Sequence, residues 1–300
     1  MYDINHRREV MQTLAESMDE LLDKFLVSPD KNWQPTDMLP NSNSPDFLDE
    51  VKELQELAME IDYDLFAVLI GDTITEEALP TYQSWLMGLD GVDQGERKGW
   101  TQWIRAWTAE ENRHGDMLNK YLYLSGRVNM KEMEISTQYL IGDGFDIHTA
   151  TDPYKNFVYT SFQEIATNVS HRRVGEFVKK QGNDQLAKMC AFVAADEARH
   201  GTAYKEFVRR IFELDPSEMM LAFQFMMKKK ITMPAHFLRE SGENIGDVYT
   251  YFSEAAQRAK VYTSTDYIDI LKSLLKDWDI TNIKGLNDKA EKARDYVMAL

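Results

Sequence analysis

The pentapeptides Glu-Glu-Asn-Arg-His (110–114) and Asp-Glu-Ala-Arg-His (196–200) decide the fold class of this 300-residue chain. Each contains a glutamate three residues before a histidine, giving the pairs Glu111/His114 and Glu197/His200. Positions i and i+3 of an α-helix share a face, so each pair can present a carboxylate and an imidazole to one metal ion. Two such pairs in helical sequence predict a helix bundle that holds two metal ions.

The residues around both motifs follow the apolar rhythm of a single helix face. The first stripe is Ile104, Trp107, Glu111, His114, Leu118 and Tyr121, and the second is Cys190, Val193, Glu197, His200, Tyr204, Phe207 and Ile211. A charged glutamate on an apolar face is costly unless it is paired, hydrogen-bonded or bound to metal. A single pair would be read as a surface ion pair or a satisfied core histidine, whereas two copies favour a metal site.

A di-metal bundle takes one further glutamate from each of two other helices. Glu76 precedes Glu111 by 35 residues, and Glu164 precedes Glu197 by 33, so the chain contains a quasi-repeat of helix pairs. Spacing alone does not separate Glu76 from Glu77, or Glu111 from Glu110.

The chemistry of these side chains favours iron or manganese. Four carboxylates and two neutral imidazoles carry four negative charges, which two divalent ions would cancel. The donor set contains no thiolate, which argues against a closed zinc site. Asp196 and Glu110 are candidates to accept the ring N–H bonds of the two histidines. As helix neighbours of the motifs, they can equally be solvated carboxylates.

Composition excludes several partners. The net charge of −16 disfavours nucleic acid and anionic membranes. No apolar run approaches about 18 residues, so no membrane-spanning segment is expected. The opening residues are polar and show no targeting segment, and the lone Cys190 fits a reducing compartment. We therefore expect a cytoplasmic protein.

The chain is predicted to be one domain over 1–300, almost entirely helical. Its parts are an N-terminal helix with an extended proline-containing arm (1–45), the metal-binding bundle (46–231) and accessory helices (232–300). The expected helices cover 5–27, 46–61, 63–89, 97–126, 153–181, 183–213, 216–231, 245–259, 264–277 and 284–298. Pro80 lies within the helix that carries Glu76, and its ring would clash with the Glu76 carbonyl. A kink there either aims the ligand or only bends a long helix.

Several longer stretches resemble soluble acyl-acyl carrier protein desaturases of the stearoyl type. They are Thr-Glu-Glu-Ala-Leu-Pro-Thr-Tyr-Gln (75–83), Trp-Thr-Ala-Glu-Glu-Asn-Arg-His-Gly-Asp (107–116), Asn-Lys-Tyr-Leu-Tyr-Leu-Ser-Gly-Arg-Val (119–128), Tyr-Thr-Ser-Phe-Gln-Glu (159–164), the Ala-Ala-Asp-Glu-x-Arg-His motif (194–200) and Lys-Lys-Ile-Thr-Met-Pro-Ala-His (229–236). The similarity runs from about Trp33 to Tyr296. It implies a ferritin-like four-helix di-iron bundle with additional helices, assembled as a homodimer and supplied with electrons by ferredoxin.

The resemblance also assigns residues. It implies that two iron ions are held by Glu76, Glu111, His114, Glu164, Glu197 and His200. It places Thr167 beside the oxygen-binding side of the cluster as a catalytic candidate. Trp33 and Asp196 join His114 in an electron-transfer route.

The implied reaction belongs to fatty acid biosynthesis. With O2 and ferredoxin electrons, a saturated chain on acyl carrier protein receives a cis double bond, expected at the Δ9 position. Trp85 and Asn156 fall where the resemblance puts the closed end of the acyl slot, and both are larger than the plant residues. We expect a shorter slot that favours palmitoyl over stearoyl, because protein interiors have little spare volume. Lys228, Lys229 and Lys230, together with Arg239, are the candidate docking cluster for the acidic carrier protein, and Arg209 and Arg210 are another candidate.

Other di-iron classes use similar ligands. An iron-storage or ferroxidase protein would bind many irons, and a related N-oxygenase would act on nitrogen. A ribonucleotide reductase small subunit would need a radical tyrosine near the cluster, for which Tyr204 is a candidate, although a tyrosine on a helix stripe is usually a core residue. Acyl-dependent oxygen use distinguishes a desaturase from all three.

Overall fold

The structure is a computed structural model that describes residues 4–239 and 248–300, and no strand occurs among them. The α-helices are α1 (Ile4–Ala15), α2 (Met18–Phe25), α3 (Phe47–Met59), α4 (Tyr63–Glu77), α5 (Leu79–Met87), α6 (Gly99–Ser125), α7 (Met130–Asp143), α8 (Pro153–Lys180), α9 (Asp184–Leu214), α10 (Pro216–Lys229), α11 (Val248–Arg258), α12 (Ser264–Asp277) and α13 (Asp288–Met298). Short 3-10 turns cover Pro35–Asp37 (η1), Pro234–Phe237 (η2) and Ile280–Asn282 (η3). The predicted all-α class is therefore confirmed.

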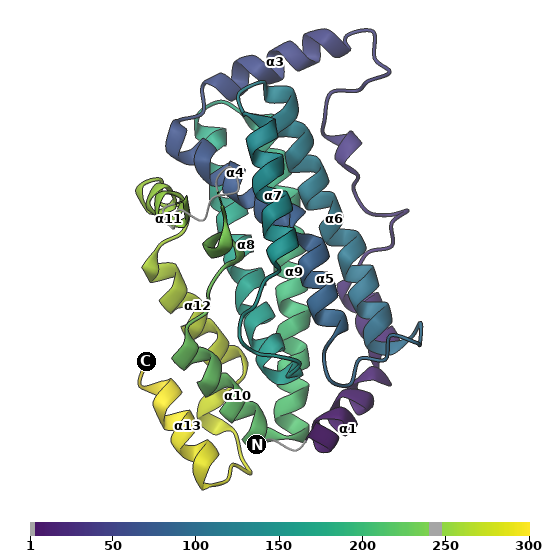
Figure 1. Ribbon diagram of the computed structural model, residues 1–300, viewed down its shortest axis with the longest axis vertical. Helices are drawn as coiled ribbons and strands as arrows, with labels where there is room; N and C mark the ends of the chain where they lie inside the picture. The colour runs from purple at the N-terminus through teal and green to yellow at the C-terminus, as the bar shows by residue number, and fades with distance from the viewer. Residues whose placement is uncertain (1–3, 240–247) are drawn as a thin grey trace.

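The long helices α6, α8 and α9 run along the length of the molecule, and the shorter α4 completes the centre of the bundle (Figure 1). Helix α8 packs along α9, and α4 packs along α6. Helix α3 lies across one end, whereas α10, α12 and α13 gather at the other end beside the C-terminus (Figure 1). The predicted bundle with additional helices thus describes the architecture.

The bundle helices form where the sequence offers an apolar stripe and a cap. Helix α8 begins with Pro153, whose fixed φ suits a first helical position, after Asp152, whose side chain accepts the N–H groups of Tyr154 and Lys155. Helix α6 ends at Gly126, which adopts the left-handed conformation at φ 64°. Both predicted stripes face inward, since their apolar residues in α6 and α9 are buried.

The predicted helix 63–89 is two helices rather than one. Helix α4 ends at Glu77, Ala78 has φ −76° and ψ 10°, and α5 starts at Leu79 with Pro80 in its first turn. Pro80 cannot donate to the Glu76 carbonyl, so the helical hydrogen bonding stops at this point. The helix is therefore interrupted rather than bent, two residues after Glu76, which is expected to bind metal.

The structure differs from the predicted helices at two other places. The helix expected over 5–27 divides at Glu16 and Ser17 into α1 and α2, and the Ser17 hydroxyl bonds the Leu14 carbonyl at this break. Helix α7 was not predicted, because its buried face consists only of Met133, Thr137 and Leu140. It packs against α4. Residues 245–247 of the predicted helix 245–259 lie outside the described residues.

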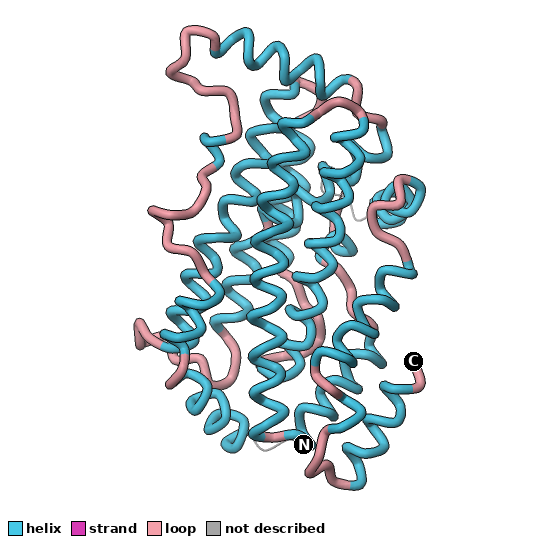
Figure 2. The backbone as a smooth tube through the Cα atoms, turned by 180° about the vertical axis from the view of Figure 1, so that it is seen from behind, coloured by secondary structure: helices cyan, strands magenta, loops and turns pink. Residues whose placement is uncertain are grey.

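The expected N-terminal arm runs over residues 26–46, where η1 is the helical element. From behind, this segment follows the outside of the bundle as a long irregular trace between α2 and α3 (Figure 2). Within residues 4–239 and 248–300, no helix combines the length and the apolar character that crossing a membrane requires.

Candidate metal centre

All six predicted ligands come together inside the bundle. Helix α4 contributes Glu76, α6 contributes Glu111 and His114, α8 contributes Glu164, and α9 contributes Glu197 and His200. All six are buried, with exposed fractions from 0% to 8%. A cluster of four carboxylates at this depth is unfavourable unless positive charge or hydrogen bonds compensate it.

The ligand atoms form two overlapping sets. One set contains Glu76, Glu111, His114 and Glu197, and the other contains Glu111, Glu164, Glu197 and His200. Within each set, one nitrogen or oxygen atom from every residue lies within 4.8 Å of the others. Because Glu111 and Glu197 belong to both sets, the geometry suits two neighbouring ions bridged by two carboxylates.

Both histidines turn the same ring nitrogen inward. Nδ1 of His114 lies 3.1 Å from Oε2 of Glu111 and 3.3 Å from Oε1 of Glu197. Nδ1 of His200 lies 2.5 Å from Oε1 of Glu111 and 3.8 Å from Oε2 of Glu164. Nδ1 is therefore available as a metal donor in each ring, while Nε2 faces outward.

Orphaned polar atoms show that these residues fit a metal. Nδ1 of His114 and Oε1 of Glu164 are fully buried and have no hydrogen-bond partner among the described residues. Buried polar atoms are normally satisfied, and a metal ion is one way of satisfying them. The donor set of imidazole nitrogens and carboxylate oxygens suits iron and manganese.

Electrostatics agree with that fit. Burial raises the pKa of the Glu164 carboxyl well above its usual range, and the neighbouring carboxylates of Glu197 and Glu111 raise it further. Burial alone would lower the pKa of His200, but Glu111 and Glu110 outweigh it and raise that pKa to about 9. Both shifts mean that the cluster favours added positive charge, which two divalent cations would supply.

A glycine follows each Glu-x-x-His motif and allows the helices to approach closely. A Cβ atom on Gly115 would lie 3.2 Å from the backbone carbon of Glu76, and one on Gly201 would lie 3.3 Å from Cβ of Glu164. Both distances are shorter than ordinary contacts, so the ligand-bearing helices touch at these glycines. Sequence reasoning missed this role, although Arg-His-Gly occurs in both halves of the quasi-repeat.

Contacts separate the two pairs of adjacent glutamates that spacing left open. Glu77 turns away from the cluster and accepts a hydrogen bond from Nδ2 of Asn119 at 2.7 Å. Glu110 lies outside the ligand sets, where its Oε2 is 2.8 Å from Nε2 of His200. Glu76 and Glu111 are therefore the members that face the cluster.

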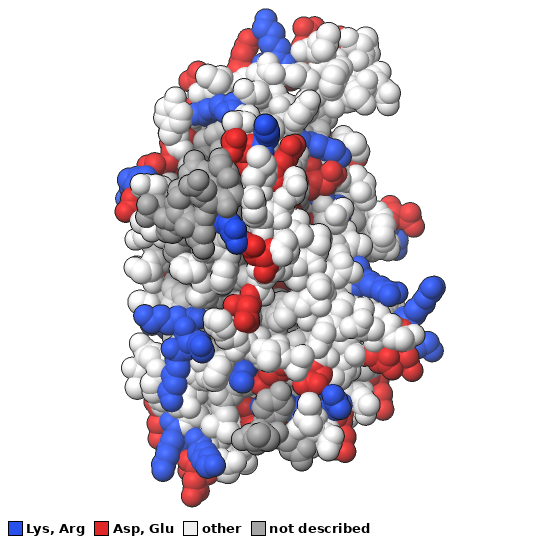
Figure 3. Space-filling view, in the orientation of Figure 1, with Lys and Arg blue, Asp and Glu red and all other residues white. Residues whose placement is uncertain are grey.

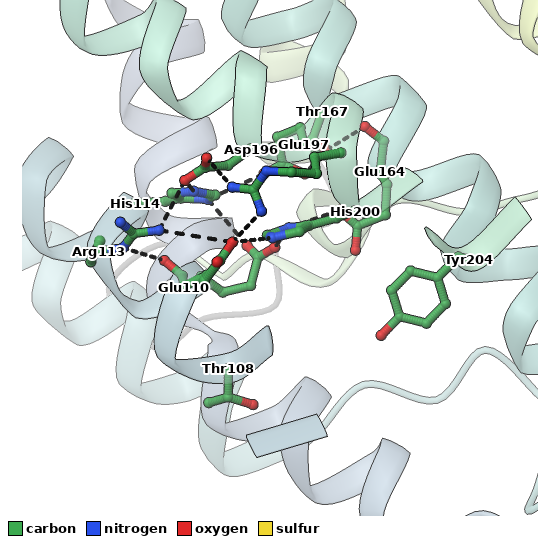
Figure 4. A network of polar contacts seen from close by, with 12 residues as sticks. Thr108, Glu110, Arg113, His114, Glu164, Thr167, Asp196, Glu197, His200 and Tyr204 are labelled. Atoms are coloured by element: carbon green, nitrogen blue, oxygen red, sulfur yellow. Dashed lines mark hydrogen bonds and ion pairs between the residues drawn. The ribbon is translucent and has the colours of Figure 1, made fainter. Parts of the chain in front are cut away.

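A second layer of carboxylates supports the histidines across the helix pair (Figure 4). Oδ2 of Asp196 on α9 lies 3.3 Å from Nε2 of His114 on α6. In the same way, Glu110 on α6 meets His200 on α9. Such outer hydrogen bonds fix the tautomer and the orientation of a metal-bound imidazole.

Trp33 reaches this layer from the N-terminal arm. Its Nε1–H donates to Oδ2 of Asp196 at 3.0 Å, and its ring is stacked on His114 with 6.0 Å between ring centroids. The guanidinium of Arg113 lies 4.5 Å from the centre of the Trp33 ring, a cation–π distance. The three residues of the predicted electron route are thus in contact.

Thr167 lies between the carboxylate cluster and a cavity. Its hydroxyl donates to Oε2 of Glu197 at 2.8 Å, and the side chain lines the cavity together with Glu76, Glu111, Glu164 and Glu197. The apolar side chains that line the cavity include Tyr82, Trp107, Met233 and Phe252, which come from different helices and loops. A largely apolar ligand could therefore reach the cluster.

The two predicted slot residues have different environments. Trp85 belongs to an aromatic group behind the cavity wall, with ring centroids 5.7 Å from Tyr159 and 6.3 Å from Phe145. Asn156 does not line this cavity, and its Nδ2 donates to Oγ1 of Thr149 at 3.0 Å and to the Asp152 carbonyl at 2.6 Å. Asn156 therefore holds the turn before α8.

The structure adds His171 to the surroundings of the cluster. Its Nε2 lies 2.9 Å from Oε1 of Glu76, and its side chain is buried. The spacing 164, 167 and 171 is one helix stripe and could have indicated it. Tyr204 is buried among Trp103, Trp107, Phe157 and Phe207, as a core residue would be. In Figure 4 it lies apart from the polar network.

Comparisons with known proteins agree with this site. The family described as "Fatty acid desaturase" matches residues 6–300. The chain is 50% identical to the stearoyl-[acyl-carrier-protein] 9-desaturase, chloroplastic, of Spinacia oleracea over 97% of its own length and 73% of the relative. It is 48% identical to the protein of the same name from Gossypium hirsutum, over 98% of its length and 75% of the relative.

A solved structure shares the fold at much lower sequence identity. The X-ray structure of DesA2 from Mycobacterium tuberculosis H37Rv is 17% identical and has a TM-score of 0.57, covering 96% of this chain and 98% of that one. The sequence motifs, the buried cluster and the match over nearly the whole length lead to one conclusion. The chain belongs to the fatty acid desaturase family.

Proposed function

We propose that this protein is an acyl-[acyl-carrier-protein] desaturase that uses two iron ions, O2 and external electrons to introduce a cis double bond. The observation that carries the proposal is the pair of overlapping ligand sets sharing Glu111 and Glu197. Relatives named stearoyl-[acyl-carrier-protein] 9-desaturase, about half identical to this chain, support the substrate class and the Δ9 position.

Each of the six buried residues has a role at such a site. Glu76 and His114 would hold one ion, Glu164 and His200 the other, and Glu111 and Glu197 would bridge both. Iron bound there would supply the oxidation of the acyl chain by O2. The balance is R–CH2–CH2–R′ + O2 + 2 H⁺ + 2 e⁻ → R–CH=CH–R′ + 2 H2O, so two electrons must come from outside.

The cavity supports an acyl substrate. Its apolar walls would exclude water from a saturated chain, and its carboxylate face would put one CH2–CH2 segment beside the ions. Thr167 lines the same cavity and hydrogen-bonds a bridging carboxylate. We assign it the role of orienting Glu197 and supplying a hydroxyl where oxygen would bind.

Trp85 is our candidate for limiting chain length. It packs against Phe145 and Tyr159, and Phe145 in turn contacts Tyr82 of the cavity wall with 5.7 Å between ring centroids. These packed aromatic rings have little space into which they could move to admit a longer chain. A preference for palmitoyl over stearoyl rests on Trp85, and Asn156 acts only through the turn that it holds.

Electrons would reach the ions through Trp33, Asp196 and His114. The continuous contact between these residues supports that route. Phe192 extends it toward solvent, because its ring lies 6.0 Å from Trp33 and its side chain is 37% exposed. A small one-electron carrier such as ferredoxin is the donor that fits this path.

The carrier protein is proposed to dock at Lys228, Lys229 and Lys230. All three are exposed at the end of α10, and Nζ of Lys228 lies 4.8 Å from the ring centre of Tyr296 on α13. Lys and Arg side chains gather along the lower left of the molecule, where Figure 1 places α10, α12 and α13 (Figure 3). A local basic surface is needed because the whole chain carries a charge of −16.

The homodimer, the cytoplasmic location and the division at residues 45 and 231 stay predictions. The test of the proposed function is oxygen consumption by the iron-loaded protein with reduced ferredoxin. Oxygen use that depends on acyl carrier protein carrying a saturated chain supports a desaturase. Many irons per chain would indicate storage, and a stable tyrosyl radical would indicate a reductase subunit.

A further inference from the structure

Arg199 contacts both Asp196 and Glu110, the two carboxylates of the second layer that support the histidines. Its Nη2 donates to Oδ1 of Asp196 at 2.5 Å, and its Nη1 donates to Oε2 of Glu110 at 2.7 Å. The side chain lies on α9, one residue before His200, and it is partly buried. Nη1 also donates to the Phe25 carbonyl at 2.8 Å, which ties the end of α2 to the same place.

Each of these carboxylates serves one histidine. Asp196 meets Nε2 of His114 at 3.3 Å, and Glu110 meets Nε2 of His200 at 2.8 Å. The two histidine–carboxylate pairs are therefore not independent, since one guanidinium joins them. In Figure 4 dashed lines join Asp196 to His114 and Glu110 to His200.

The charges of this layer are balanced. Asp196 and Glu110 carry two negative charges, and Arg113 and Arg199 carry two positive charges. Arg113 donates to Oδ2 of Asp196 at 3.0 Å and to the main-chain carbonyl of Glu110 at 3.2 Å, but its Nη2 lies 4.0 Å from the Glu110 carboxylate. Arg199 thus supplies the direct charge-assisted bond to Glu110, as well as the link between the two sides.

We propose that Arg199 is a positioning residue that couples the two histidine ligands and sets the reduction potential of both metals together. This inference rests on the proposed two-iron site. A carboxylate that shares its charge with a guanidinium accepts less strongly from an imidazole N–H. The histidine is then a weaker electron donor, and the reduced metal is favoured.

Two substitutions separate charge from geometry. Arg199→Gln removes the positive charge, so both histidines become stronger donors and the midpoint potential of the iron pair shifts to a more negative value. Arg199→Lys keeps the charge but replaces the planar two-nitrogen fork by a single ammonium, so it does not reproduce the separate bonds of Nη1 to Glu110 and Nη2 to Asp196. The midpoint potential then stays near the wild-type value, while the electronic environments of the two irons differ more from each other.

The experiment combines a redox titration with Mössbauer spectroscopy of the iron-loaded full chain. Arg209→Gln is the matched control, because Arg209 lies on the same helix and pairs with Glu206 and Glu213. We expect a negative shift for Arg199→Gln, a larger difference between the two quadrupole doublets for Arg199→Lys, and neither effect in the control.

Wild-type potential in Arg199→Gln together with wild-type doublets in Arg199→Lys would overturn the inference while leaving the proposed function intact. A wild-type chain that takes up no iron pair would contradict both. Thermal melting of the metal-free variants identifies any loss of folding. If Arg199→Gln does not fold, the quadrupole doublets of Arg199→Lys decide whether the inference about Arg199 holds.

Discussion

Gly201 lies against Glu164 so closely that a Cβ atom on the glycine would be 3.3 Å from Cβ of the glutamate. Gly115 stands in the same relation to Glu76, with 3.2 Å to its backbone carbon. Each glycine directly follows the histidine of its motif. The approach of the helices, and with it the spacing of the carboxylates, thus depends on two positions without a side chain.

Gly115→Ala and Gly201→Ala should each weaken metal binding. Gly115→Ala should have the larger effect, because its added methyl group would meet backbone atoms of Glu76 and Glu77, whereas that of Gly201→Ala would meet mainly side-chain atoms. Overpacking of this kind costs about 1–3 kcal/mol. The check is iron stoichiometry with thermal melting, against Gly142→Ala in α7, whose added methyl group meets no atom of the described residues within 4 Å. Equal behaviour of all three variants would refute the argument.

Thr167→Val should uncouple oxygen use from desaturation. Valine keeps the shape of the cavity wall but cannot donate to Oε2 of Glu197. We expect about a tenfold loss of product per O2 consumed, or about 1.4 kcal/mol of transition-state stabilisation. The control is Thr202→Val, whose exposed hydroxyl donates to the Ala198 carbonyl of its own helix. Unchanged coupling in Thr167→Val would remove this residue from the reaction.

Trp33→Phe should slow electron delivery and leave the chemistry intact. The substitution keeps an aromatic ring over His114 but loses the Nε1–H bond to Asp196. Reduction by ferredoxin should slow by about tenfold, as for the loss of about 1.4 kcal/mol. A small chemical reductant that reaches the ions directly should reduce both proteins alike. Trp278→Phe, which loses an indole bond to the Lys205 carbonyl, is the control.

Trp85→Met should move the substrate preference toward longer chains. The smaller side chain opens space beside Phe145 and Tyr159, and the ratio of stearoyl to palmitoyl turnover should rise by about tenfold, a 1.4 kcal/mol effect. Asn156→Gly serves as the comparison, since it should cost about 1–2 kcal/mol of stability through its lost hydrogen bonds without changing the ratio. The reverse pattern would show that Asn156 limits the slot.

Glu206→Gln should make stability less dependent on acid pH. Hydrogen bonds from Arg209, and then from Arg210, lower the pKa of Glu206 from 4.5 to about 2. A carboxyl with a depressed folded-state pKa contributes stability above its unfolded value, and this is lost as the pH falls from 4.5 toward 2. Because solvent screens Arg209, we expect a difference of about 1 kcal/mol at pH 7 that vanishes near pH 2. Denaturant titrations across this range measure it, with Glu213→Gln as the exposed control.

The sequence predicted the helical class, because two repeated motifs on apolar stripes leave few alternatives. The resemblance to a known family implied which glutamates meet in the bundle, since spacing alone left Glu76 or Glu77, and Glu110 or Glu111, open. The sequence did not predict the helix break at Ala78, since Pro80 within a helix can bend it or end it. Helix α7 was not predicted, because its stripe of buried residues is short. Glu110 was expected to accept from a histidine, but its pairing with His200 of the other motif depends on how α6 and α9 pack, which no local pattern contains. The same holds for the backbone N–H of Val27, which donates to Glu110 from the distant arm.

Product analysis after a single turnover tests the central claim most directly. Iron-loaded protein with reduced ferredoxin and O2 would receive palmitoyl- or stearoyl-acyl carrier protein, and the released fatty acids would be identified by mass spectrometry. The account predicts one cis double bond at the Δ9 position, in palmitoyl more than in stearoyl. Saturated chains alone, recovered from protein with two reducible irons bound, would contradict it.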